Sequence, residues 1–168
     1  MKLLLIVAVL TAAATAAQYA HHGPAVLPDP KVTPGKVRTT DWKEVCEGGS
    51  TKQYRHTTEA EKNKVYAWYG AMKKAGVCCE VDHLVSLELG GADELPNLWP
   101  QPYEPRPGAH EKDAVENYLH KRVCKDQDVR LEDAQKAIAK DWYAVYLGMR
   151  SNVTWCPDSG CVPKGANH

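Results

Sequence analysis

A polar motif between residues 80 and 113 constrains the fold of this chain more than any other segment. Its first part alternates loosely between apolar and polar side chains, which predicts a short strand, and Gly90 and Gly91 follow where the chain can reverse. Residues 92 to 101 predict a returning strand, and from about residue 110 an apolar spacing predicts a helix. The apolar positions on this helix are Ala114, Tyr118 and Leu119. The order of elements is therefore strand, strand, helix.

The adjacent pair Asp82 and His83 indicates hydrolytic chemistry at the end of the first strand. Neighbouring side chains of a strand point to opposite faces, so one residue would bind a metal while the other faces the substrate. Histidine, with an ordinary pKa of about 6.5, is suited to accept a proton from water near neutral pH. A divalent cation acts as a Lewis acid on a phosphate and stabilises a departing oxygen. The pair is therefore typical of metal-dependent phosphodiester cleavage.

Residues 79 to 123 resemble the HNH endonucleases of the ββα-metal superfamily. The resemblance rests on Asp82-His83, followed in order by Asn97 and by His110 at the start of the predicted helix. The resemblance implies an α+β fold in which flanking helices and disulfides support a ββα-metal motif. It also implies that His83 is the general base, that Asn97 pins the loop and orients the base, and that Asp82 and His110 bind one divalent metal ion. Mg²⁺ or Mn²⁺ is favoured for such an open oxygen and nitrogen site, with Zn²⁺ as the alternative.

Five further residues are weaker candidates for the site. Glu80 would support a metal ligand or be a solvated strand residue, and Lys112 would contact phosphate or lie in solvent. Arg55, Arg106 and Arg122 are candidates for binding substrate phosphates, with ordinary surface roles as the alternative. The chain has 21 basic and 21 acidic residues, so no overall positive field draws nucleic acid to it and any such attraction must be local.

The first 17 residues predict a cleavable secretory signal peptide. Lys2 precedes an apolar run at residues 3 to 10, and small residues continue to Ala17. A membrane anchor is the alternative, but the apolar run is shorter than the ~20 residues that a spanning helix needs. We therefore expect a secreted or periplasmic protein that has no membrane association after signal removal.

Six cysteines fit an exported chain, because disulfides form and persist outside the cytoplasm. They are Cys46, Cys78, Cys79, Cys124, Cys156 and Cys161. The last two predict a local bridge across a turn rich in Pro, Asp and Gly. Because adjacent cysteines rarely bond each other, the sequence favours separate bridges from Cys78 and Cys79 to Cys46 and Cys124. Zinc binding by cysteine is the alternative, although the usual Cys-x-x-Cys pairs are missing, as is the zinc knuckle of many HNH proteins.

The rest of the chain predicts one small domain with two further helices. Residues 18–40 are proline-rich and should form an extended, poorly packed lead-in, residues 41–150 the nuclease domain, and residues 151–168 a tail. A capping box predicts a helix over about 58 to 73, and an amphipathic spacing predicts another from Leu131, which should cover the nuclease motif.

The sequence therefore predicts an exported, metal-dependent endonuclease that cleaves DNA with little sequence preference. RNA is a second candidate substrate. Two other classes remain open. One is a non-catalytic extracellular binding module with the same fold, and the other is a structural domain stabilised by an enclosed metal. The sequence identifies neither an inhibitor or immunity partner nor a physiological role.

Overall fold

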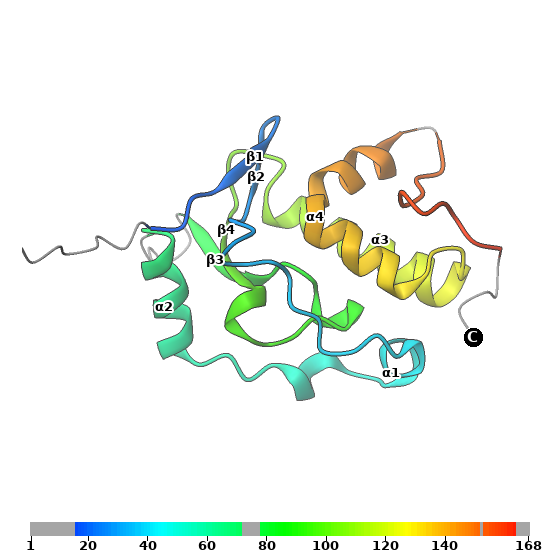
Figure 1. Cartoon of the computed structure of the whole chain (residues 1–168), viewed down its shortest axis with the longest axis horizontal. Helices are drawn as coiled ribbons and strands as arrows, with labels where there is room; N and C mark the ends of the chain where they lie inside the picture. The colour runs from blue at the N-terminus through cyan, green and yellow to red at the C-terminus, as the bar shows by residue number, and fades with distance from the viewer. Residues whose placement is uncertain (1–15, 72–77, 152, 164–168) are drawn as a thin grey trace, which may run out of the picture.

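The structure is a computed structural model that describes residues 16–71, 78–151 and 153–163; most of the expected signal peptide lies outside these ranges. The described residues form a small α+β protein with two antiparallel sheets and four α-helices (Figure 1). In order these elements are β1 (Ala20–His22), β2 (Ala25–Leu27), α1 (Trp42–Glu47), α2 (Glu59–Trp68), β3 (Cys79–His83), β4 (Leu98–Pro102), α3 (Ala109–Lys121) and α4 (Leu131–Arg150). Short helical turns are η1 (Thr51–Tyr54), η2 (Leu87–Leu89), η3 (Leu95–Asn97) and the π-helical η4 (Arg122–Asp126). Within the described residues no helix is long and apolar enough to cross a membrane.

The predicted strand pair is the β3–β4 hairpin, in which His83 pairs with Leu98. The first strand ends at His83 rather than near residue 89, and the two turns η2 and η3 fill the connection. Gly90 ends η2 with a φ of 79°, whereas Gly91 is required by space, because a Cβ there would lie 1.9 Å from the carbonyl oxygen of Val85. The two glycines reverse the chain for different reasons.

The helix that follows the hairpin buries part of the predicted face, because Leu119 is buried and Tyr118 packs against the core. Ala114 is exposed, and the buried residues of α3 are Ala109, Lys112, Val115 and Leu119. Val115 and Leu119 lie one turn apart and enter the core between the hairpin and α4. The prediction missed Lys112 because it considered apolar residues alone.

The helix α4 spans the predicted region but breaks at Asp141, where φ is −167° and ψ is 87°. One carboxylate oxygen of Asp141 accepts a hydrogen bond from the backbone N–H of Ala144 at 2.9 Å, so it caps the second half of the helix. The first half packs against α3, and its Gln135 donates to the Leu89 carbonyl at 2.7 Å. The helix was predicted to cover the motif, and it contacts both α3 and η2 in the β3–β4 loop.

The lead-in, residues 18–40, was expected to be poorly packed, and this expectation is wrong. It contains the β1–β2 hairpin, in which Ala25 is fully buried, and the indole N–H of Trp142 donates to the Val26 carbonyl at 3.3 Å. Pro24 lies in the turn and therefore does not interrupt the ladder. A proline count does not reveal that α4 provides an apolar partner for this segment.

The helix α2 begins with the predicted capping box between Thr58 and Glu61. It ends at Trp68, earlier than expected, because Gly70 adopts a φ of 61°. Residues 72 and 73 of the expected helix lie outside the described residues. In Figure 1, α2 lies on one side of the β3–β4 hairpin, and α3 with α4 lies on the other.

All six cysteines are in disulfides, and one of the three predicted bridges is correct. The bridge between Cys156 and Cys161 is confirmed. The other pairs are Cys46 with Cys124 and the adjacent Cys78 with Cys79, so the prediction of two bridges to the strand is wrong. With every thiol oxidised, a zinc site built from cysteine is excluded in this state.

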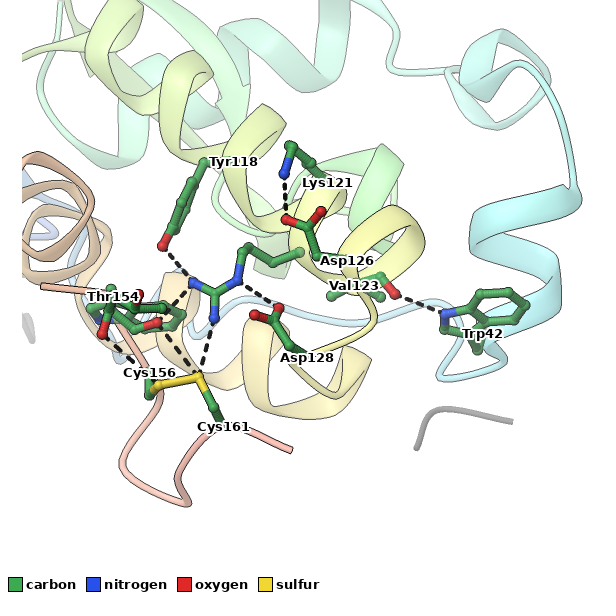
Figure 2. Close-up of polar contacts among 11 residues, drawn as sticks. Trp42, Tyr118, Lys121, Val123, Asp126, Asp128, Thr154, Cys156 and Cys161 are labelled. Atoms are coloured by element: carbon green, nitrogen blue, oxygen red, sulfur yellow. Dashed lines mark hydrogen bonds and ion pairs between the residues drawn. A yellow bond between two sulfur atoms is a disulfide. The ribbon is translucent and has the colours of Figure 1, made fainter. Parts of the chain in front are cut away.

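The pairing of Cys46 follows from the position of α1. This helix packs against η4 rather than the start of β3, and the Trp42 indole N–H donates to the Val123 carbonyl at 3.1 Å (Figure 2). That contact brings the Cα atoms of Cys46 and Cys124 to 5.3 Å, within the usual range for a disulfide.

We expect simultaneous substitution of Cys46 and Cys124 by serine to lower the free energy of unfolding by about 2–5 kcal/mol. The bridge joins residues 78 positions apart, so its removal releases a long loop in the unfolded chain. Equilibrium denaturation under oxidising conditions measures the loss. The control replaces Cys156 and Cys161, which are five positions apart and should contribute less. Equal losses in the two variants would contradict this account.

Candidate active site

The last residue of β3, His83, is buried, with 3% of its surface exposed, and its Nε2 lies 2.7 Å from a carboxylate oxygen of Asp93. The Thr57 hydroxyl donates to this same oxygen of Asp93, Oδ1, and the backbone N–H of His56 donates to the other oxygen, Oδ2. Burial alone would raise the pKa of Asp93, but these hydrogen bonds and that of His83 hold it below its ordinary value. The carboxylate is therefore ionised at neutral pH.

His83 itself is neutral at neutral pH. Burial lowers its pKa below the ordinary value, although the hydrogen bond to Asp93 and the negative charges of Asp82 and Asp93 act in the opposite direction. The positive charge of Arg55 also lowers this pKa. A neutral imidazole is the form that can accept a proton.

Asn97 is fully buried and pins the loop between the strands, as the resemblance implies. Its side-chain oxygen accepts from the Val85 N–H at 2.9 Å, and its side-chain nitrogen donates to the carbonyls of Val85 at 2.8 Å and Ala92 at 2.9 Å. These contacts fix the backbone on both sides of the turn. The hydrogen-bond partner of the His83 ring, however, is the carboxylate of Asp93 and not Asn97.

Lys112 lies at the centre of the site, and both roles expected for it are wrong. Its side chain is completely buried, and Nζ donates to Asp82 Oδ2 at 2.8 Å, to the His83 carbonyl at 2.7 Å and to the Glu116 carboxylate. Burial would lower the pKa of Lys112, but the charges of Asp82 and Glu116 raise it above its ordinary value. This ammonium holds the end of β3 against α3.

The beginning of α3 brings His110 near the acidic side of the hairpin. His110 is exposed, and its ring lies 5.5 Å, between centroids, from that of Tyr103, whose hydroxyl donates to Glu80 at 3.1 Å. Burial and then the charge of Asp82 raise the pKa of Glu80 and of Asp113, whereas His110 lowers both. The two acids and His110 are thus electrostatic neighbours, and Asp82 adds to the same concentration of negative charge.

A divalent cation in this region would have few protein ligands. Across residues 16–71, 78–151 and 153–163, no group of three or more His, Cys, Asp or Glu side chains is arranged to hold a metal ion. Lys112 contacts Oδ2 of Asp82, so the other carboxylate oxygen, Oδ1, could coordinate a cation. The imidazole of His110 is exposed. A divalent ion bound by these two residues would complete its shell with water and phosphate.

The three arginines occupy different environments. Arg55 is exposed, and its positive charge lies close enough to His83 to lower the pKa of the imidazole. Arg106 is 62% exposed and lies within 3.6 Å of Glu104 and 3.4 Å of Glu111, so its charge is partly offset.

The expectation that Arg122 binds substrate is wrong, because its guanidinium is buried beneath the C-terminal segment. It donates to Asp128 at 2.6 Å, to the Tyr118 hydroxyl at 2.5 Å and to the Trp155 carbonyl at 2.8 Å. Figure 2 shows two of these partners, Tyr118 and Asp128, above the Cys156–Cys161 bridge. Arg122 therefore anchors the tail to α3.

Asp93 and Thr57 are site residues that the sequence motif did not indicate. Asp93 follows Gly90-Gly91 within the loop, where an acid is also an ordinary turn residue. Its only sequence signal is its place between the two strands of the motif.

Comparison of the sequence with protein-family models found no match, and comparisons with curated proteins and with solved structures found none either.

Proposed function

We propose that this protein is an exported, metal-dependent endonuclease that hydrolyses phosphodiester bonds of DNA with little sequence preference. RNA is a second candidate substrate. The observation that carries the proposal is the neutral, buried His83 at the end of β3, adjacent to Asp82 and followed along the chain by Asn97 and His110. The succession β3, β4, α3 agrees with the ββα-metal motif that the HNH resemblance implies. Three disulfides agree with export to an oxidising compartment.

The proposed reaction begins when His83 accepts a proton from a water molecule. The water oxygen forms a bond to phosphorus, and the bond from phosphorus to the 3′ oxygen breaks, which leaves a 5′-phosphate. The leaving 3′ oxygen takes a proton from solvent, and His83 later returns its own proton to solvent. Asp82 and His110 would hold a divalent cation, which supplies Lewis-acid stabilisation of the phosphate and the leaving oxygen. Arg55 is placed to attract the phosphate electrostatically.

Two features of the site support a single open cation site over an enclosed structural metal. The cysteines that form most structural zinc sites are all oxidised here. The carboxylates of Glu80 and Asp113 have raised pKa values and lie near Asp82, so added positive charge would relieve their repulsion. A structural metal would stabilise the fold, whereas the proposed catalytic ion is needed for cleavage alone.

We expect the oxidised protein, purified from an exporting host, to cleave supercoiled plasmid in Mg²⁺ or Mn²⁺ and to lose this activity in chelator. Gel electrophoresis of the plasmid and of a single-stranded RNA, in Mg²⁺, Mn²⁺, Zn²⁺ or chelator, measures metal and substrate preference. Circular dichroism in chelator shows whether the fold persists. Absence of cleavage in every metal, from folded protein without free thiols, would refute the nuclease and favour a binding module. Unfolding in chelator would favour the structural metal.

A further inference from the structure

The His83–Asp93 pair has features that a surface ion pair lacks. The side chains of His83 and Asp93 expose only 4% and 7% of their side-chain surface, and the two atoms in contact are 2.7 Å apart. The carboxylate also accepts hydrogen bonds from Thr57 and from the backbone of His56, which precede α2. The end of β3 and the segment before α2 thus converge on the carboxylate of Asp93, which lies in the β3–β4 loop.

The chemistry of the two groups determines which nitrogen of His83 carries the proton. An ionised carboxylate can only accept hydrogen bonds, and a neutral imidazole has one donor and one acceptor nitrogen. Since Nε2 faces Asp93, Nε2 carries the hydrogen and Nδ1 keeps its lone pair. The protein therefore selects between two tautomers that are close in energy in a free imidazole.

We propose that Asp93, held by Thr57, is the positioning residue of the active site, and that it fixes His83 in the Nε2–H tautomer with Nδ1 as the proton acceptor. This inference rests on the proposed nuclease function. When Nδ1 takes the proton from water, His83 becomes an imidazolium, and the adjacent carboxylate stabilises that charge. Asp93 contributes orientation and electrostatic stabilisation but does not itself take a proton.

We expect the Asp93→Asn variant to lose about 10²-fold or more in kcat for plasmid cleavage, with KM for DNA changed by less than about threefold. Asparagine preserves the shape but can present an N–H to Nε2, which favours the wrong tautomer. Thr57→Val, which keeps the size of the side chain but removes one donor to Asp93, should lose less. The nitrogen chemical shifts of the His83 ring, measured at one fixed pH, should show Nε2–H in the wild type and a shift toward Nδ1–H in Asp93→Asn.

The chain contains a matched control in His22 and Asp141, a second His–Asp pair, 2.6 Å apart, on β1 and α4. Asp141→Asn should leave kcat unchanged, because asparagine also caps helices and the pair lies outside the proposed site. The inference is overturned if the wild-type His83 is Nδ1–H, a result that requires neither a variant nor activity. It is also overturned if folded Asp93→Asn keeps the wild-type kcat while His83→Ala loses it. Retention of activity by His83→Ala would instead refute the proposed function.

Discussion

Replacing His83 with alanine should lower the rate of phosphodiester cleavage by about 10²–10⁴-fold, the contribution of a positioned general base. The structure supports this expectation because the imidazole is neutral at neutral pH and fixed by Asp93. The substitution removes the proton acceptor but none of the groups expected to hold the metal. KM for DNA should therefore change much less than kcat.

Single-turnover cleavage of plasmid measures this effect without a contribution from product release. A second variant, His83→Asn, keeps an N–H donor for Asp93 but has no basic nitrogen, so it should be as inactive as His83→Ala. His21→Ala removes an exposed histidine on β1 and is the control for losses that arise from preparing a variant protein. It should cleave at the wild-type rate. If either folded His83 variant retained more than about a tenth of the wild-type rate, His83 would not be the base.

The elements of the site could be predicted from sequence where one local pattern determines them. The alternation before Gly90, the pair Asp82-His83 and the capping box at Thr58 are short-range signals, and the β3–β4 hairpin and the start of α2 follow them. The loop-pinning contacts of Asn97 were also expected, but from the resemblance to the HNH endonucleases rather than from a local pattern.

The rest of the site depends on contacts between segments far apart in the chain. The contacts of Asp93 with His56 and Thr57 are recognisable only when the segment before α2 is known to lie beside the loop. The same reasoning applies to Cys46, whose partner is determined by the packing of α1 on η4. Neither contact has a periodicity or spacing that a reader of the sequence could use.

Lys112 is the clearest case of a residue whose environment reverses the usual expectation. Lysine is almost never fully buried unless it is paired, and this one stands in a run of polar residues at the start of α3. Its burial is favourable only because Asp82, Glu116 and the His83 carbonyl surround its ammonium group. Those partners come from β3 and from the next turn of the helix.

We therefore expect Lys112→Met to lower the free energy of unfolding by about 3–5 kcal/mol, although methionine has a similar length and packs well in apolar surroundings. The loss arises because Asp82 and Glu116 would remain in a buried region without the cation that compensates them. Urea denaturation followed by tryptophan fluorescence measures the change. The triple variant Asp82→Asn, Lys112→Met, Glu116→Leu removes the unpaired charges together and should recover much of the loss.

The same helix provides the control that separates burial from the mere loss of a charge. Lys121 also pairs with an acid, Asp126, but its side chain is 58% exposed. Lys121→Met should therefore cost about 1 kcal/mol or less, because water can solvate the remaining carboxylate. Equal effects at the two positions would mean that the Lys112 ammonium is not enclosed by its partners. A large difference would instead show that the end of β3, and with it the proposed base and metal ligand, is held in place by one buried cation.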